Sequence, residues 1–372
     1  MGTFAEGEGG TSDSRTYSAR ARNAKEQRIA LRVNGYTGEN AVANFPALVR
    51  LSNGVGGFNY ARLSDEGATF GDIHFQDASG NELPFEIDTW NPEGESLFWV
   101  KMPSLSRGAK IFLAYGVEYT PEESADLLRA GVWAGMTGVW HLGKMASGYY
   151  GNSANQDMDT LRGKDNNSIG VASGVIGTAR TISTDAADVK NGQAIVVSNN
   201  DLLDLGDSFA VSVWLKYKSG QNPGWDRVIS RKNAYNSDDG WEITLSSGNS
   251  SNIDVRGSNS KSGGAGFFSS PVNDGNWHYV TAVYSEEKVF LYENGVFRLE
   301  VGIESAADNN QDLSFGNNAA KGEVTFKGTL DEIRLGAGSL SADRIKADYE
   351  TVADPEFFVA SEFIPGFMIF VR

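Results

Sequence analysis

Cysteine is absent from this chain of 372 residues, and histidine is scarce. Without cysteine there can be no disulfide bond, thiolate metal site or cysteine nucleophile. The three histidines, His74, His141 and His278, are scattered over separate strand-like motifs, where a hydrogen-bonded structural histidine is the common outcome. A zinc site and a Ser/His/Asp catalytic arrangement are therefore not expected, and the sequence has no glycine-rich phosphate loop.

Long apolar runs and a surplus of basic residues are also missing. No stretch approaches the roughly 18 apolar residues of a membrane-spanning helix. Residues 1–6 show no basic region followed by an apolar run, so we expect any export signal of the natural protein to have been cleaved or left outside this chain. The 32 Lys and Arg residues face 48 Asp and Glu residues, and the resulting net charge of −16 repels nucleic acid and anionic membranes. The same acidity suits cations, calcium above all.

Glycine and aromatic residues are abundant. The 44 glycines, the 11% aromatic content and the recurrent Asn-Gly, Asp-Gly and Ser-Gly pairs are typical of short strands joined by tight turns, which predicts an all-β protein. A chain of this length has room for two domains with separate cores, so we expect two antiparallel β-sandwiches in tandem. The predicted segments are a flexible lead-in (1–16), an N-terminal β-sandwich (17–118), a linker with a short helix (119–138), a larger β domain (139–352) and an apolar C-terminal tail or strand (353–372).

Strand-period alternation supports both sandwiches. In the first domain it runs through 28–33, 45–51, 72–75, 85–88, 97–102 and 110–115. In the second it runs through 194–197, 209–217, 227–230, 241–245, 278–284, 289–292 and 329–335, and Asn294-Gly295 predicts a hairpin between two strands.

Two short helices are expected. In the linker, Thr120 is predicted to cap a helix with Pro121 at its first position, followed by two glutamates near the positive end of the dipole. Ser341 is predicted to cap a second helix that closes the larger domain. The apolar segment 357–372 is too short to cross a bilayer. It is expected to be a final strand of one sandwich, or else an exposed strand that adds to a neighbouring subunit.

The second domain resembles the laminin-G-like branch of the concanavalin A-like jelly rolls. The matching motifs span about 210 residues: Val139-Trp-His-Leu, Phe209-Ala-Val-Ser-Val-Trp-Leu, Asp239-Gly-Trp-Glu-Ile, Asp274-Gly-Asn-Trp-His-Tyr-Val, Val289-Phe-Leu-Tyr-Glu-Asn-Gly, Phe326-Lys-Gly-Thr-Leu-Asp-Glu-Ile-Arg-Leu and Leu340-Ser-Ala-Asp. The first domain is similar to a bacterial domain of unknown function that often precedes such jelly rolls, through Asp72-Ile-His-Phe, Phe85-Glu-Ile-Asp-Thr-Trp-Asn and Phe98-Trp-Val-Lys-Met-Pro. The resemblance implies a jelly roll that binds sugars, proteins or calcium through its loops and concave sheet.

Calcium is the cofactor that this resemblance implies, as a structural ion. In the similar jelly rolls an ion can tie the opening loop to the strand with the Leu-Asp-Glu motif, which here contains Asp331. Asp157 and Asp159 in the opening loop could supply further oxygens, and a second cluster comprises Asn236, Asp238 and Asp239. Because calcium takes six to eight oxygens, backbone carbonyls and water would have to complete either site. The alternative is a pair of acidic, solvated loops.

Loop aromatics are the candidates for sugar binding, because an exposed ring can pack against the apolar C–H face of a sugar. Trp225, Tyr235, Tyr149 and Tyr150 are assigned to loops and are the predicted ligand-binding residues. Trp214, Trp241 and Trp277 follow strand patterns and are expected in the core.

A catalytic role has little support in the sequence. Some jelly rolls cleave polysaccharides with a Glu, Asp, Glu trio on one strand, and Glu86-Ile-Asp88 offers only two members, in the first domain. This pair is expected to face solvent. The sequence therefore predicts a non-enzymatic, lectin-like adhesion protein, secreted or on a bacterial cell surface or else periplasmic, that binds a glycan or protein surface. The alternatives are a structural subunit of a surface filament or envelope assembly, which could self-assemble through the C-terminal segment, and a polysaccharide-cleaving glycosidase.

Overall fold

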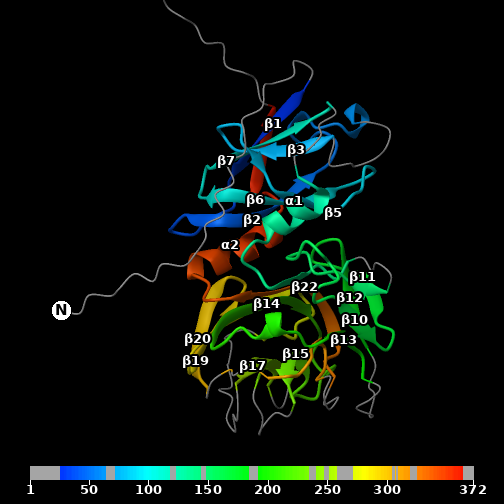
Figure 1. Ribbon diagram of the computed structural model, residues 1–372, viewed down its shortest axis with the longest axis vertical. Helices are drawn as coiled ribbons and strands as arrows, with labels where there is room; N and C mark the ends of the chain where they lie inside the picture. The colour runs from blue at the N-terminus through cyan, green and yellow to red at the C-terminus, as the bar shows by residue number, and fades with distance from the viewer. Residues whose placement is uncertain are drawn as a thin grey trace, which may run out of the picture.

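The computed structural model describes residues 26–63, 72–117, 123–143, 148–183, 192–233, 240–246, 251–257, 271–303, 306, 309–318 and 325–362. Both expected β-sandwiches are present, and the all-β prediction is confirmed (Figure 1). The predicted lead-in (1–16) and residues 363–372 lie outside the described part of the chain.

The first sandwich packs a five-stranded sheet on a three-stranded one. The sheets have the strand orders β23-β1-β7-β3-β4 and β2-β6-β5, and the pairings within them are antiparallel. A continuous apolar cluster fills the space between them, and Phe45, Phe75 and Leu113 in it are fully buried. The strands are β1 (Gln27–Val33), β2 (Val42–Leu51), β3 (Ile73–Gln76), β4 (Glu82–Leu83), β5 (Phe85–Thr89), β6 (Ser96–Leu105), β7 (Lys110–Tyr115) and β23 (Phe358–Glu362).

The C-terminal end of the described chain returns to the first sandwich. Strand β23 pairs antiparallel with β1, from Val33 opposite Phe358 to Ile29 opposite Glu362. In Figure 1 this last strand lies beside the first, although they are separated by the whole jelly roll in sequence. The first sandwich is therefore built from two distant pieces of chain, and β23 pairs through one of its two edges, as the terminal strand of the five-stranded sheet.

The second domain is a jelly roll of two antiparallel sheets. The seven-stranded sheet has the order β17-β16-β15-β21-β13-β10-β9, and the eight-stranded sheet has the order β11-β12-β22-β14-β18-β19-β20 with β8 pairing to β22. The strands are β8 (Gly138–Trp140), β9 (Tyr149–Tyr150), β10 (Gly163–Asn166), β11 (Gly170–Ser173), β12 (Thr178–Ile182), β13 (Ala194–Val197), β14 (Ser208–Lys216), β15 (Arg227–Lys232), β16 (Gly240–Leu245), β17 (Ile253–Arg256), β18 (His278–Ser285), β19 (Lys288–Glu293), β20 (Val296–Gly302), β21 (Leu313–Phe315) and β22 (Gly328–Ala337).

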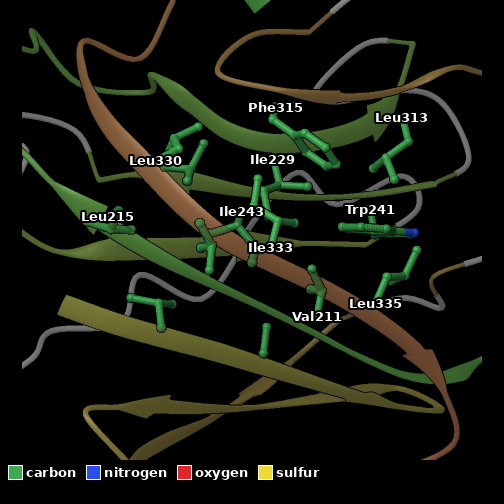
Figure 2. Packing of buried hydrophobic residues seen from close by; sticks show 14 of the residues in the cluster. Val211, Leu215, Ile229, Trp241, Ile243, Leu313, Phe315, Leu330, Ile333 and Leu335 are labelled. Carbon is green, nitrogen blue, oxygen red and sulfur yellow. The ribbon is translucent and has the colours of Figure 1, made fainter. Parts of the chain in front are cut away.

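The sequence of β14 is almost continuously apolar because both faces of this strand are buried. Because side chains alternate along a strand, Val211 and Leu215 enter the core between the two sheets, where they meet Ile243 and Phe315 (Figure 2). The alternate side chains, Trp214 among them, point away from that core into a second apolar cluster against the first domain. A strand that is buried on both faces has no polar face to display.

A bulge in β22 places two consecutive carboxylates on one face of the sheet. The register with β14 shifts between Ser212 and Trp214, and Glu332 has a left-handed backbone with φ of 47°. A bulge resets the alternation of side chains. Leu330, Ile333 and Leu335 therefore face the core, whereas Asp331 and Glu332 lie together in the electrostatic network at the domain junction.

Two helices fill the space between the sandwiches. Helix α1 (Ala125–Val132) packs on β5 and β6, and α2 (Ala342–Ala353) packs on β2 and β20 (Figure 1). The Ser341 cap of α2 is confirmed, since its side chain accepts the N–H of Arg344 at 3.2 Å. The predicted cap of α1 is wrong: Ser124 caps the helix, and Thr120 and Pro121 lie outside the described residues. Neither helix is long and apolar enough to cross a membrane, as judged over the described residues.

The Asn-Gly hairpin forms as expected. Asn294 and Gly295 connect β19 to β20 with φ of 51° and 76°, the two left-handed residues that a type I′ turn requires.

Candidate functional site

Trp225 is an exposed indole held at the start of β15. The backbone N–H of Trp225 donates to the carbonyl of Leu245 at 3.0 Å, and the backbone N–H of Leu245 donates to the carbonyl of Asp226 at 2.9 Å. This backbone pairing with the end of β16 fixes the segment. The backbone of Trp225 is left-handed, with φ of 64°, and the residue is 42% exposed. A large residue in this conformation is strained, and such strain persists where surrounding contacts hold it in place.

Two buried arginines provide those contacts. The guanidinium of Arg256 lies 4.7 Å from the centre of the Trp225 ring, and Arg227 Nη1 donates to the Trp225 carbonyl. Both arginines also pair with Glu242, at 3.3 Å from Arg227 and 3.6 Å from Arg256. Buried charged side chains that pair with one another therefore hold Trp225 in place.

Carboxylates around this network keep unused acceptor capacity. Buried oxygens of Glu242, Asp254 and Asp226 receive no hydrogen bond from the described residues. Burial raises the pKa of Asp254 to about 6, although Arg256, at 3.2 Å, works in the opposite direction.

The strands that carry this site belong to the sheet farther from the first domain. In Figure 1, β15 and β17 lie in the lower sheet, whereas β14 and β22 lie next to the helices and the first sandwich. The first domain therefore does not cover the sheet face on which Glu242 and Asp254 lie.

The two predicted tyrosines of the opening segment belong to β9 rather than to a loop. Tyr150 is 1% exposed and forms part of the core between the sheets, so its assignment to a ligand-binding loop is wrong. Tyr149 is partly exposed, and the guanidinium of Arg162 covers its ring at 3.6 Å. Neither ring offers a free face comparable to that of Trp225.

The structure does not bring together the three aspartates predicted to bind calcium. Asp331 is fully buried and its Oδ2 accepts the N–H of Val175 at 2.9 Å, whereas Asp157 and Asp159 are exposed. Asp157 Oδ1 accepts the N–H of Asp159 at 3.0 Å, and Asp159 pairs with Arg162. Among the described residues, the group of three ligand atoms within 4.8 Å of one another is a different one, treated below. These three residues do not fit a common calcium ion.

The remaining predicted site residues lie outside the described part of the chain. They are Tyr235, Asn236, Asp238 and Asp239. Calcium binding by the last three stays a prediction.

The sequence analysis missed the buried polar and charged side chains beside Trp225. Glu242, Thr244, Asp254 and Arg256 occupy alternate positions in two strands whose other residues enter the core, and all four are buried. The period-2 pattern places them on the outer face, where charged residues are ordinarily solvated, so the pattern gave no sign of their burial.

The expectation that Glu86 and Asp88 face solvent is wrong. Glu86 is 6% exposed and accepts hydrogen bonds from the indole of Trp133 at 2.6 Å and the hydroxyl of Ser153 at 2.7 Å. The side chain of Asp88 is 10% exposed. Both carboxylates lie at the junction of the two domains because β5 turns this face toward the jelly roll.

Comparison with known proteins identifies both domains. Residues 189–346 match the model of the concanavalin A-like lectin/glucanases superfamily, and residues 69–127 match a domain of unknown function (DUF2341). Comparison with curated proteins finds no match.

Comparison with solved structures finds matches of low sequence identity and with TM-scores below 0.5. Domain 4 of AbnA, an extracellular arabinanase from Geobacillus stearothermophilus solved with arabinotriose, is 19% identical, with 57% of this chain and 97% of that chain covered and a TM-score of 0.40. A botulinum neurotoxin type C structure, from work on its entry through two ganglioside molecules, is 14% identical, with 59% and 51% covered and a TM-score of 0.45. The binding domain of Paraclostridial Mosquitocidal Protein 1 is 12% identical, with 58% and 52% covered and a TM-score of 0.43. The match thus spans about half the length of these two toxin chains. The chain carries a domain of the concanavalin A-like lectin/glucanases superfamily preceded by a domain of unknown function of the DUF2341 family.

Proposed function

We propose that this chain is a non-catalytic, lectin-like protein that binds a glycan at the Trp225 face and acts outside the cytoplasm. The observation that carries the proposal is the exposed Trp225 indole, fixed in a left-handed backbone conformation against buried Arg256. An immobilised aromatic ring loses little conformational entropy when a ligand packs on it. The superfamily to which the jelly roll belongs, one of lectins and glucanases, supports a saccharide as the ligand.

The chemistry of the face suits a neutral sugar. The indole can cover the apolar C–H side of a pyranose or furanose ring. The arginines are already engaged by carboxylates, at 3.2 Å from Arg256 to Asp254 and 3.3 Å from Arg227 to Glu242. A charged sugar would have to displace those pairs.

The test is saturable binding to immobilised glycans, followed by calorimetry with the best oligosaccharide. Trp225→Ala is expected to weaken binding at least about tenfold, since it removes the platform but no core packing. Phe297→Ala is the matched control, because Phe297 is 50% exposed in the other sheet and its loss should leave the affinity unchanged.

Two outcomes would count against the proposal. Equal binding by wild type and Trp225→Ala would place the ligand elsewhere, and release of reducing ends from a polysaccharide panel by the wild-type protein would show that the chain is an enzyme. Unchanged far-UV circular dichroism and an unchanged melting temperature of both variants verify that the fold is retained.

A further inference from the structure

Three side chains from three segments converge at the junction between the domains. They are Asp88 of β5, His141 just after β8 and Glu332 of β22, and one ligand atom of each lies within 4.8 Å of the others. His141 Nδ1 is 2.6 Å from Glu332 Oε1 and 3.6 Å from Asp88 Oδ2. The first domain supplies one of these groups and the jelly roll supplies the other two.

The second polar atom of each side chain is held by a neighbour. Asp88 Oδ1 accepts the hydroxyl of Thr89 at 2.8 Å, and Glu332 Oε2 accepts Arg334 Nη2 at 3.0 Å. His141 Nε2 lies 3.2 Å from Glu86 Oε2. These contacts aim Asp88 Oδ2, His141 Nδ1 and Glu332 Oε1 at one another, an arrangement that resembles the outer-sphere support of protein metal ligands.

Glu86 is itself held firmly. The indole of Trp133 and the hydroxyl of Ser153 donate to its two oxygens at 2.6 and 2.7 Å. A metal-binding histidine usually donates its other N–H to such a carboxylate, which fixes the tautomer and the orientation of the ring. Glu86 stands in that position relative to His141 Nε2.

The junction is short of positive charge. The carboxyl groups of Glu86, Asp88 and Glu332 pair with His141 or Arg334 as their cations, and Asp348 also pairs with Arg334. The only ion-pair partner recorded for Asp88 in the described structure is His141 at 3.6 Å, although nine-tenths of this carboxylate is buried. A divalent cation would supply the missing charge.

The donor set favours a transition metal over calcium. Calcium takes six to eight oxygens, whereas zinc binds imidazole nitrogen at about 2.0–2.1 Å and carboxylate oxygen at about 2.0–2.2 Å. Ligands at those distances in a tetrahedron are about 3.3 Å apart. His141 Nδ1 lies 2.6 Å from Glu332 Oε1 and 3.6 Å from Asp88 Oδ2, values that bracket this distance, and the third pair of ligand atoms lies within 4.8 Å.

We propose that Asp88, His141 and Glu332 bind one divalent transition-metal ion of the zinc type, which ties the first domain to the jelly roll. Glu86 orients the imidazole and does not bind the ion. The site is separate from the Trp225 face, because it lies at the eight-stranded sheet rather than the seven-stranded one.

Calorimetric titration of the chelator-treated full chain with Zn²⁺ tests the proposal. We expect one ion per chain, a higher melting temperature with the ion, and visible d–d absorption from a low-symmetry site when Co²⁺ replaces Zn²⁺. Ca²⁺ at the same concentration should produce none of these effects. Asp88→Asn, which keeps the shape of the side chain, should weaken Zn²⁺ binding at least about 100-fold and alter the Co²⁺ spectrum.

Asp157→Asn is the matched control, since it removes the same charge from an exposed carboxylate and should bind Zn²⁺ as the wild type does. Glu332→Gln is a second ligand variant should Asp88→Asn fail to fold. No uptake of Zn²⁺ by the folded wild type would overturn the proposal. So would unchanged binding by a folded Asp88→Asn or Glu332→Gln variant, or a loss of binding in Asp157→Asn alone.

Discussion

Trp133 Nε1 donates a hydrogen bond to Glu86 Oε2 at 2.6 Å, which joins the C-terminal end of helix α1 to strand β5 of the first sandwich. The same carboxylate contacts His141 and Ser153 of the jelly roll. Around it, apolar side chains of both domains form one continuous cluster. The two sandwiches therefore share a core of their own, and we expect them to unfold as a single cooperative unit.

Trp133→Phe tests how much this polar contact contributes. The substitution keeps an aromatic ring but leaves buried Glu86 without one donor, which should lower the free energy of unfolding by about 1–3 kcal/mol. Chemical denaturation in metal-free buffer, followed by tryptophan fluorescence, measures the change.

Trp225→Phe is the control for this experiment, because it is the same substitution at a residue that is 42% exposed. It should change the free energy of unfolding by less than about 0.5 kcal/mol. Equal denaturation midpoints for Trp133→Phe and wild type, or two separate transitions in the wild type, would contradict a junction stabilised in this way.

His278 should make stability depend on pH. Burial opposes protonation of its ring, but hydrogen bonds to Glu293 at 2.7 Å and Asp274 at 3.1 Å outweigh burial and raise the pKa of His278. A raised folded-state pKa gives stability that is complete below the unfolded-state value of about 6.5 and is lost as pH rises through the folded-state value. The advantage of wild type over His278→Gln should therefore be largest near pH 5.5 and shrink toward pH 9.

Denaturation of both proteins across this range measures that advantage. The other histidines are present in both proteins, so their titrations cancel in the difference. Arg298 also contacts Glu293, at 2.7 Å, and keeps that carboxylate paired when His278 is replaced. A difference that grows with pH would show that His278 is buried as the neutral ring.

Much of the fold is predictable from the sequence, for a physical reason. The pattern of Phe209 to Leu215 predicts a strand because every side chain in it except that of Ser212 enters one of two apolar clusters. Asn294-Gly295 predicts the hairpin because few other pairs accept two left-handed conformations. The Ser341 cap was predictable because it depends only on local hydrogen bonding.

The junction was not predictable in this way. Glu86 and Asp88 occupy alternate positions of a short strand and give the pattern of a solvated face, whereas the jelly roll covers them. Their partner His141 is more than fifty residues away, and Glu332 turns toward them only through a bulge. Trp225, predicted as a ligand-binding loop residue, is 42% exposed, and its ligand-binding role stays a prediction. The arginines that hold it lie in strands whose pattern gives no sign of that contact.

Gly295 offers the last test, because it combines a left-handed backbone with a close contact to α2. With φ of 76°, alanine at this position would incur a backbone cost of about 1 kcal/mol. Its Cβ would also lie 3.0 Å from Lys346 Cα and 3.3 Å from Tyr349 Cβ. Gly338 has a φ of 79° but nothing within 4 Å of an added Cβ, so Gly338→Ala incurs the backbone cost alone.

We expect Gly295→Ala to be the more destabilising by at least about 1 kcal/mol, since the helix must move or the turn must open. Thermal or urea unfolding of the pair measures the difference. Equal decreases in the free energy of unfolding of the two variants would mean that α2 can move away from the added methyl group at little cost, and that its contact does not restrict the hairpin.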